Sequence, residues 1–195
     1  MIMISLFKKK AALLVFIFLI AIFLMAIIFA NNDKSTGLLE AYNIAYSEVC
    51  KSSDHIELLL ITSVDEPTST PDDGKNGRRR YWNMIFADPT SSDKEFIVSI
   101  HDRTVKVVPI QSEIDRTQFI NMNDLKLTSE KAVSMAINDY GLLPGQDCAR
   151  GYHFVVHSFD NQIDFQVVGL GANNKMMRIA FDGSGNYLKT LMPHG

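Results

Sequence analysis

Two histidines, His153 and His157, are four residues apart, the spacing at which two side chains on one face of a helix can share a metal ion. Their segment, Tyr-His-Phe-Val-Val-His-Ser-Phe, is rich in β-branched and aromatic residues and therefore predicts a strand. On a strand the two residues would be about 13 Å apart, whereas zinc ligands lie about 2.0–2.1 Å from the metal. We therefore predict no metal site and no cofactor site.

A second candidate for chemistry is the adjacent acid–base pair His101 and Asp102, with Ser99 as the nearest hydroxyl. Adjacent residues at a turn point apart, and Ser99 lacks the flanking glycines of a nucleophile elbow. Asp102 fits a turn role better. The sequence predicts a protein that is not an enzyme, and a hydrolase is the enzyme alternative.

Three consecutive arginines, Arg78, Arg79 and Arg80, form the sharpest basic cluster. They stand in an acidic context: without the three lysines that precede Asn32, the chain has 16 basic and 22 acidic residues, a net charge of −6. Such a charge gives no reason to bind nucleic acid. The cluster is a candidate contact with an acidic protein partner, lipid headgroups or wall polymers, and a solvated loop edge is the alternative.

The two cysteines, Cys50 and Cys148, are too far apart in sequence for a CxxC metal or redox motif. Outside the cytoplasm, where disulfides persist, they are a candidate disulfide pair. Two unpaired buried thiols are the alternative, and the sequence leaves both open.

The longest apolar stretch, Ala11 to Ala30, has neither a charge nor a proline. Twenty helical residues span about 30 Å, the thickness of a bilayer core, and Lys8 to Lys10 before it favour a cytoplasmic N-terminus. A cleaved signal peptide would have a shorter apolar region and a small residue where bulky Ile28 stands. We therefore predict an uncleaved signal anchor, a single-pass transmembrane helix in the cell membrane, with the rest of the chain extracytoplasmic.

Beyond the polar spacer, the pattern predicts a helix whose buried positions are Leu38, Tyr42, Ala45 and Val49, capped by Ser35 or Thr36. Strand patterns follow, interrupted by the proline- and glycine-rich loop Asp65 to Gly77. On the second strand, Trp82, Met84 and Phe86 should face the core. The expected strands are Ile56 to Val64, Arg80 to Ala87, Glu95 to Ile100 and Val105 to Val108, the last two as a hairpin.

The second part of the chain repeats this order. A helix is predicted after the N-cap Thr128, with Glu130 in its first turn and Gly141 at its end. Strands are predicted at Tyr152 to Phe159, Ile163 to Val168, Lys175 to Phe181 and Tyr187 to Met192. The sequence is thus a doubled unit rather than a solenoid.

Three short motifs resemble the PepSY-like domains of bacterial cell envelopes. They are the helix start Leu-Thr-x-x-x-Ala at Leu127 to Ala132, the strand Trp-x-Val-x-Phe, which reads Trp-Asn-Met-Ile-Phe at Trp82 to Phe86, and the hairpin from Ile179 to Tyr187. The first copy lacks the turn glycine, and the second has Ile163-Asp164-Phe165 where the tryptophan strand belongs. The resemblance implies a cystatin-like α+β fold and a non-catalytic role in binding or restraining envelope enzymes, peptidases in particular.

The predicted fold class is α+β: an N-terminal transmembrane helix followed by two PepSY-like repeats, each a helix packed on a curled antiparallel sheet. The predicted function is a membrane-tethered extracytoplasmic module that binds or regulates an envelope protein, and a structural subunit of a membrane assembly is the alternative. The expected partners are that protein and, through Ala11 to Ala30, the membrane. The predicted parts are 1–10 cytoplasmic, 11–30 transmembrane, 31–36 spacer, 37–109 first repeat, 110–124 linker and 125–195 second repeat.

Overall fold

The computed structural model describes residues 19–20, 34–65, 73–91, 93–113, 115–146 and 149–192. The strands and the two main helices belong to one compact unit, Ser35–Gly195. Its elements are β1 (Thr36–Gly37), α2 (Leu38–Val49), β2 (Glu57–Ser63), β3 (Arg78–Arg79), β4 (Tyr81–Ala87), β5 (Lys94–His101), β6 (Thr104–Gln111), η1 (Arg116–Gln118), α3 (Ser129–Tyr140), β7 (His153–Phe159), β8 (Gln162–Leu170), β9 (Met176–Phe181) and β10 (Tyr187–Leu191).

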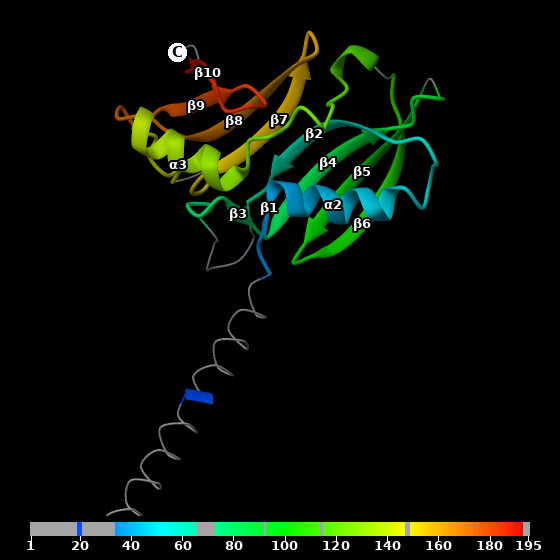
Figure 1. Cartoon of the computed structure of the whole chain (residues 1–195), viewed down its shortest axis with the longest axis horizontal. Coiled ribbons are helices and arrows are strands. Elements are labelled where there is room, and N and C mark those ends of the chain that lie inside the picture. The colour runs from blue at the N-terminus through cyan, green and yellow to red at the C-terminus, as the bar shows by residue number, and fades with distance from the viewer. Residues whose placement is uncertain are drawn as a thin grey trace, which may run out of the picture. The chain divides into compact units, whose positions relative to one another are not determined.

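Eight strands form one continuous antiparallel sheet in the order β10-β9-β8-β7-β2-β4-β5-β6 (Figure 1). Each half of the chain contributes four of these strands, and the halves join where β2 pairs with β7, with Leu60 opposite His157 and Thr62 opposite Val155. The short β1 and β3 pair separately. The predicted fold class is therefore wrong: the chain does not form two separate helix-on-sheet repeats, because β2 and β7 pair with each other and make one sheet.

Strand β4 shows why this sheet has one buried face. Its side chains alternate between fully buried Trp82, Met84 and Phe86 and half-buried Asn83 and Ile85, which confirms the predicted phase. Successive side chains on a strand point to opposite faces. The core face of the sheet therefore carries the aromatic residues, and the other face is mixed.

The two helices cover the core face, α2 against β4, β5 and β6, and α3 against β8 and β9 (Figure 1). Helix α3 begins and ends as predicted: Thr128 Oγ1 accepts a hydrogen bond from the Lys131 N–H at 3.3 Å, and Gly141 adopts the left-handed conformation with φ of 66°. Helix α2 differs from the prediction, because Gly37 rather than Ser35 or Thr36 stands at its cap. Thr36 is part of β1, so the first N–H group of α2 donates instead to Ser129 Oγ at 2.9 Å.

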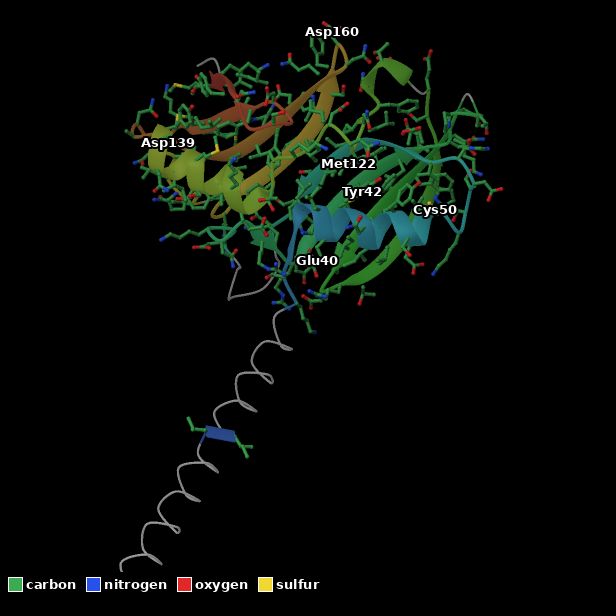
Figure 2. The ribbon with its side chains drawn as sticks, in the orientation of Figure 1. Glu40, Tyr42, Cys50, Met122, Asp139 and Asp160 are labelled. Carbon is green, nitrogen blue, oxygen red and sulfur yellow. The ribbon has the colours of Figure 1, made fainter. Side chains whose placement is uncertain are left out.

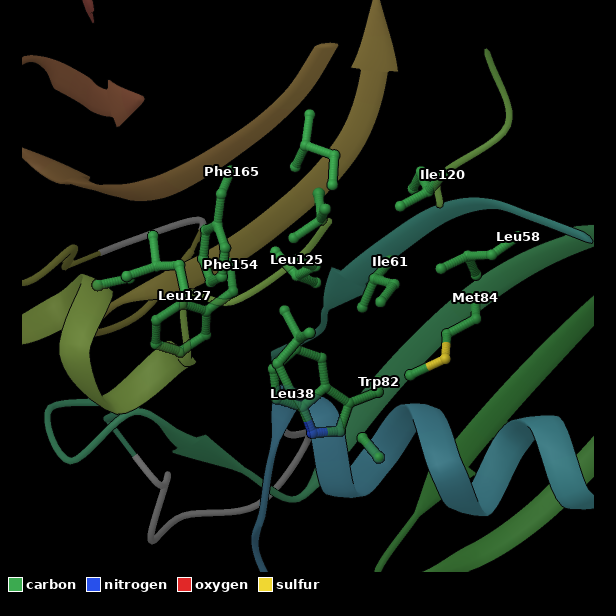
Figure 3. Packing of buried hydrophobic residues seen from close by; sticks show 14 of the residues in the cluster. Leu38, Leu58, Ile61, Trp82, Met84, Ile120, Leu125, Leu127, Phe154 and Phe165 are labelled. Carbon is green, nitrogen blue, oxygen red and sulfur yellow. The ribbon is translucent and has the colours of Figure 1, made fainter. Parts of the chain in front are cut away.

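Both halves share one hydrophobic core. Trp82 from the first half stacks on Phe154 from the second, with ring centroids 5.9 Å apart, and Figure 3 shows these two rings among Leu38, Leu127 and Phe165. Truncating a fully buried aromatic side chain to alanine lowers the unfolding free energy by roughly 3–5 kcal/mol. The halves are therefore joined by a shared core as well as by the sheet.

The predicted membrane span needs a second correction. No helix of the described residues is long and apolar enough to cross a membrane. Apart from the helical and exposed Leu19 and Ile20, the stretch Ala11 to Ala30 lies outside the described residues, as does the first half of the predicted spacer, 31–33. The signal anchor and the single-pass location in the cell membrane are therefore withdrawn with the fold class.

Candidate functional site

The three arginines proposed as a partner-binding cluster point to different places. Arg78 donates to the Ser35 carbonyl oxygen at 2.7 Å and to Glu40 Oε2 at 3.0 Å. Arg80 donates through Nε to Asp102 Oδ1 at 2.6 Å, which ties β4 to the β5–β6 turn. Each of these two arginines thus has an acidic partner within the fold.

Arg79 is fully buried at the junction between the halves. Its guanidinium donates to the carbonyl oxygens of Val64 at 3.1 Å and Arg150 at 3.2 Å, and it lies 3.4 Å from Asp65 Oδ1. Buried cations are tolerated where they are paired and hydrogen-bonded. The three arginines therefore do not form a shared exposed surface.

Beside Arg79 the fold assembles a serine–histidine–aspartate arrangement from residues that sequence analysis placed apart. The Ser63 hydroxyl lies 3.1 Å from His153 Nδ1, and His153 Nε2 lies 2.8 Å from Asp65 Oδ1. Ser63 is the last residue of β2, Asp65 follows two residues later, and His153 begins the neighbouring β7. A nucleophile, a base and an orienting carboxylate in hydrogen-bond contact are the parts of a catalytic triad.

The electrostatics of this arrangement follow from burial. Burial, and then the positive charge of Arg79, lower the pKa of His153 below its ordinary value, against the opposing effect of Asp65. Burial alone would raise the pKa of Asp65, but His153 and the backbone N–H groups of Ala149 and Arg150 together lower it. His153 is therefore neutral and Asp65 charged near pH 7.

Access argues against catalysis at this arrangement. Ser63 and His153 are 5% and 6% exposed, and the Ser63 oxygen already accepts the Phe154 N–H at 3.0 Å. A nucleophile must reach the reacting atom of a substrate, and both of these side chains are almost fully buried. The arrangement acts as a polar lock that joins β2, β3 and β7.

The remaining predicted residues are separate from one another. His157 lies four residues further along β7 on the same sheet face as His153, and its Nε2 is 3.1 Å from the Gln166 amide nitrogen. The two histidines are separated along the strand and do not meet. No group of three or more metal-ligating side chains is present in the described part of the chain. Cys50 is half-buried at the end of α2 opposite Glu40 (Figure 2). Cys148 lies outside the described residues, so the bridge stays a prediction.

An open groove of about 840 Å³ lies beside α2. One face of α2 and the start of the edge strand β6 form its walls, and we call it the α2–β6 groove. The ion pair of Arg103 with Glu40, at 2.6 Å, closes one end. The groove is lined by Glu40, Asn43, Ile44, Ser47, Glu48, Arg103 and Val105.

The outer edge of β6 exposes backbone hydrogen-bonding groups beside this groove. No strand of the described residues pairs with the outer side of β6. The Ser112 N–H donates to the Asp93 carbonyl at 3.0 Å, so these two residues are a hydrogen-bonded pair at the end of the β5–β6 ladder. Along an antiparallel ladder, hydrogen-bonded and non-hydrogen-bonded residue pairs alternate. Counted back from Ser112, residues 110, 108 and 106 bond to β5, and residues 109, 107 and 105 do not. Val105 and Val107 therefore point their backbone N–H and C=O groups away from β5, beside the groove.

A smaller groove of about 450 Å³ lies on the other side of α2, between Tyr42 and Met122 (Figure 2). Tyr42 and Tyr46 stack there with centroids 5.5 Å apart. Burial, followed by Tyr46, raises the pKa of Tyr42 to about 12, so the phenol remains protonated. Both rings pack on Phe86. Tyr42 is packed against the hydrophobic core, whereas Tyr46 is exposed.

Sequence analysis missed both the polar lock and the α2–β6 groove. A signal for the lock was present: Ser63 and His153 are polar residues at the ends of two apolar strands. The groove had no such signal, since it depends on which strands form the sheet edges.

No family model matches the sequence, and no curated protein matches it. The structure is similar to the crystal structure of a Clostridium difficile 630 protein assigned as a lipoprotein, with a TM-score of 0.54 and 10% sequence identity. The similarity covers 77% of this chain and 91% of that one. At this identity the similarity shows the fold alone, a fold shared with a bacterial protein of lipoprotein type.

Proposed function

We propose that this chain is a PepSY-like, non-catalytic module that binds a protein of the cell envelope through the α2–β6 groove. The observation that carries the proposal is the combination of an open groove with an unpaired strand edge on a rigid scaffold. Concave sites on such scaffolds are the common locations of binding. An envelope peptidase is the partner class that the family resemblance favours.

The similarity to a protein assigned as a lipoprotein supports an envelope setting for the partner. The short motifs at Leu127 to Ala132 and Trp82 to Phe86 support the PepSY-like assignment, since both form the helix and strand that they predict. A structural subunit of an assembly would use the same groove for a permanent rather than a reversible contact.

One observation favours a hydrolase, namely the hydrogen-bonded Ser63, His153 and Asp65. Their burial weighs against it, and an exposed oxyanion site beside Ser63 would also be required. Ser63→Ala separates the two functions: a hydrolase loses its activity on ester and amide substrates, whereas a binding module keeps its affinity.

Site-specific photo-crosslinking in cells of the source organism tests the proposal. A photoreactive amino acid at Ser47, exposed in the groove, should crosslink a discrete protein. The same amino acid at Phe159, which is 70% exposed at the β7–β8 turn, is the matched control. Ile44→Arg, which places a long charged side chain in the groove, should abolish the crosslink from Ser47. Crosslinks that are equal from both positions, or unaffected by Ile44→Arg, would contradict a site in the groove.

A further inference from the structure

We infer that the α2–β6 groove binds its partner by strand addition. An extended segment of the partner pairs with β6, and three successive side chains of that segment are apolar, acidic and apolar. This inference rests on the proposed function and specifies the chemistry of the occupant. Strand addition to an open edge takes its affinity from backbone hydrogen bonds and its specificity from pockets for alternate side chains.

The available backbone groups define the length of the added segment. Val105 and Val107 each offer one N–H and one C=O, by the alternation that the Ser112–Asp93 bond sets. Pro109 is the next residue in this phase and has no N–H group. The edge therefore offers five backbone groups over Val105 to Pro109, enough for about three to four partner residues.

The side-chain positions of the partner follow from the same register. Val105 and Val107 lie opposite the core residues Ile100 and Val98 of β5, so they face the helix side. Partner residues paired with them must also face that side, where Ile44 and Val105 form the apolar part of the groove. Apolar side chains are therefore required at these two positions.

The intervening partner residue lies opposite Lys106 and points to the other face of the sheet. Lys106 is exposed, and none of the described residues forms an ion pair with it. Opposite charges on directly facing residues stabilise a strand pair, and like charges destabilise it. The complementary partner residue is aspartate or glutamate.

The same register disfavours a second copy of this chain as the occupant. Two antiparallel β6 strands centred on Lys106 would place two lysines directly opposite each other. Centring the pair on Val107 would set Val105 against Pro109, which lacks a donor. The observations therefore favour a different polypeptide.

The other sheet edge is less suited to addition. Strand β10 has five residues and a register shift between Tyr187 and Lys189, whereas β6 pairs with β5 over eight consecutive residues without a shift. Bulges and short strands protect edges from pairing. Strand addition is therefore specific to β6.

Blocked synthetic pentapeptides, Thr-Val-Asp-Val-Thr and its lysine counterpart Thr-Val-Lys-Val-Thr, test this inference on the folded chain. Amide chemical shifts in β6 report binding, at peptide concentrations up to about 1 mM, where even weak binding is measurable. The aspartate peptide should shift the Val105 and Val107 amides and bind about two- to fivefold more tightly than the lysine peptide. Lys106→Glu should reverse this preference.

Val107→Pro removes one outward N–H group, and Val107→Ala is its matched control because it trims the side chain but keeps that group. Pro109 already stands in the same phase, so β6 accommodates a proline there. Val107→Pro should weaken the aspartate peptide about tenfold relative to Val107→Ala, through the lost hydrogen bond and the bulk of the ring. Ile44→Arg should block binding by any route through the groove.

Four results would overturn strand addition: no shift in β6, no charge preference, equal binding by Val107→Pro and Val107→Ala, or dimers that Val107→Pro dissociates. The last result would identify a second copy as the occupant. If Ser47 still crosslinks a protein in cells while Val107→Pro has no effect on that crosslink, the proposed function stands and the binding mode alone fails.

Discussion

The two halves of this molecule are built alike but end differently at their outer edges. Each has one helix, a buried sheet face and a final edge strand. In the second half, Tyr140 of α3 stacks on Tyr187 of β10, with ring centroids 4.8 Å apart and planes 12° apart, and Tyr140 also meets Phe181 edge-on. In the first half, Ile44 and Val105 line an open groove.

The difference shows how one scaffold can assign separate tasks to its halves. The aromatic stack ties α3 to its edge strand, and aromatic pairs of this geometry add about 0.5–1.5 kcal/mol beyond area burial. The α2–β6 edge has no such stack and retains accessible backbone groups and polar side chains. In the proposed function, the first half supplies the binding surface, whereas the second half closes its own edge strand with this stack.

The largest expected effect tests whether the halves are one folding unit. Trp82→Ala should lower the unfolding free energy by about 3–5 kcal/mol, because it empties a fully buried site against Phe154. Calorimetry should show one transition, shifted as a whole, and Phe154→Ala from the second half should have a similar effect. Two transitions, one of them at the wild-type temperature, would contradict this, because they would show that the halves unfold independently, as two domains.

Part of this architecture was predictable from the sequence. The burial of Trp82, Met84 and Phe86 follows from alternation, and the ends of α3 follow from Thr128 and Gly141. Those are local effects, set by residues close together in the chain.

The joining of the halves was not predictable in this way. The pairing of β2 with β7 connects residues about a hundred positions apart, and a similar order of elements in each half suggests separate repeats equally well. The polar lock has the same origin, since Ser63 and His153 come together only through that pairing. Likewise, consecutive arginines were interpreted as a surface cluster, whereas the short pairing of β1 with β3 buries Arg79.

A smaller effect is expected at the closed edge of the second half. Tyr187→Ala should cost about 1–2 kcal/mol by loss of the stack with Tyr140 and its buried area. Tyr187→Phe is the matched control: it keeps the ring and loses only the exposed hydroxyl contact with Thr190. Chemical denaturation measures both, and if Tyr187→Ala were as stable as Tyr187→Phe, the stack would not explain why this edge is closed.

The weakest expected effect is a pH dependence from the lock between the halves. The pKa of His153 is lowered by burial and by Arg79, so the unfolded chain binds a proton more readily than the folded one. Stability contributed by the neutral histidine should be complete above the unfolded pKa of about 6.5 and should decline as the pH falls below it. Asp65 adds a second decline in more acidic solution, below its ordinary range, because its pKa is lowered in the fold.

The measurement is the unfolding free energy at several pH values between about 7.5 and 5, the window in which an ordinary histidine titrates. His153→Gln, which cannot titrate, should show a flatter dependence than the wild type, even if it is less stable throughout. His157→Gln is the matched control, because it removes an imidazole from the same strand and leaves Ser63, Asp65 and Arg79 in contact with His153. It should keep the wild-type slope. His153 comes from the second half, and Asp65 and Arg79 come from the first. Equal slopes in all three proteins would therefore mean that the contact between the halves is not sensitive to protonation. The junction would then be held by the core and the sheet alone.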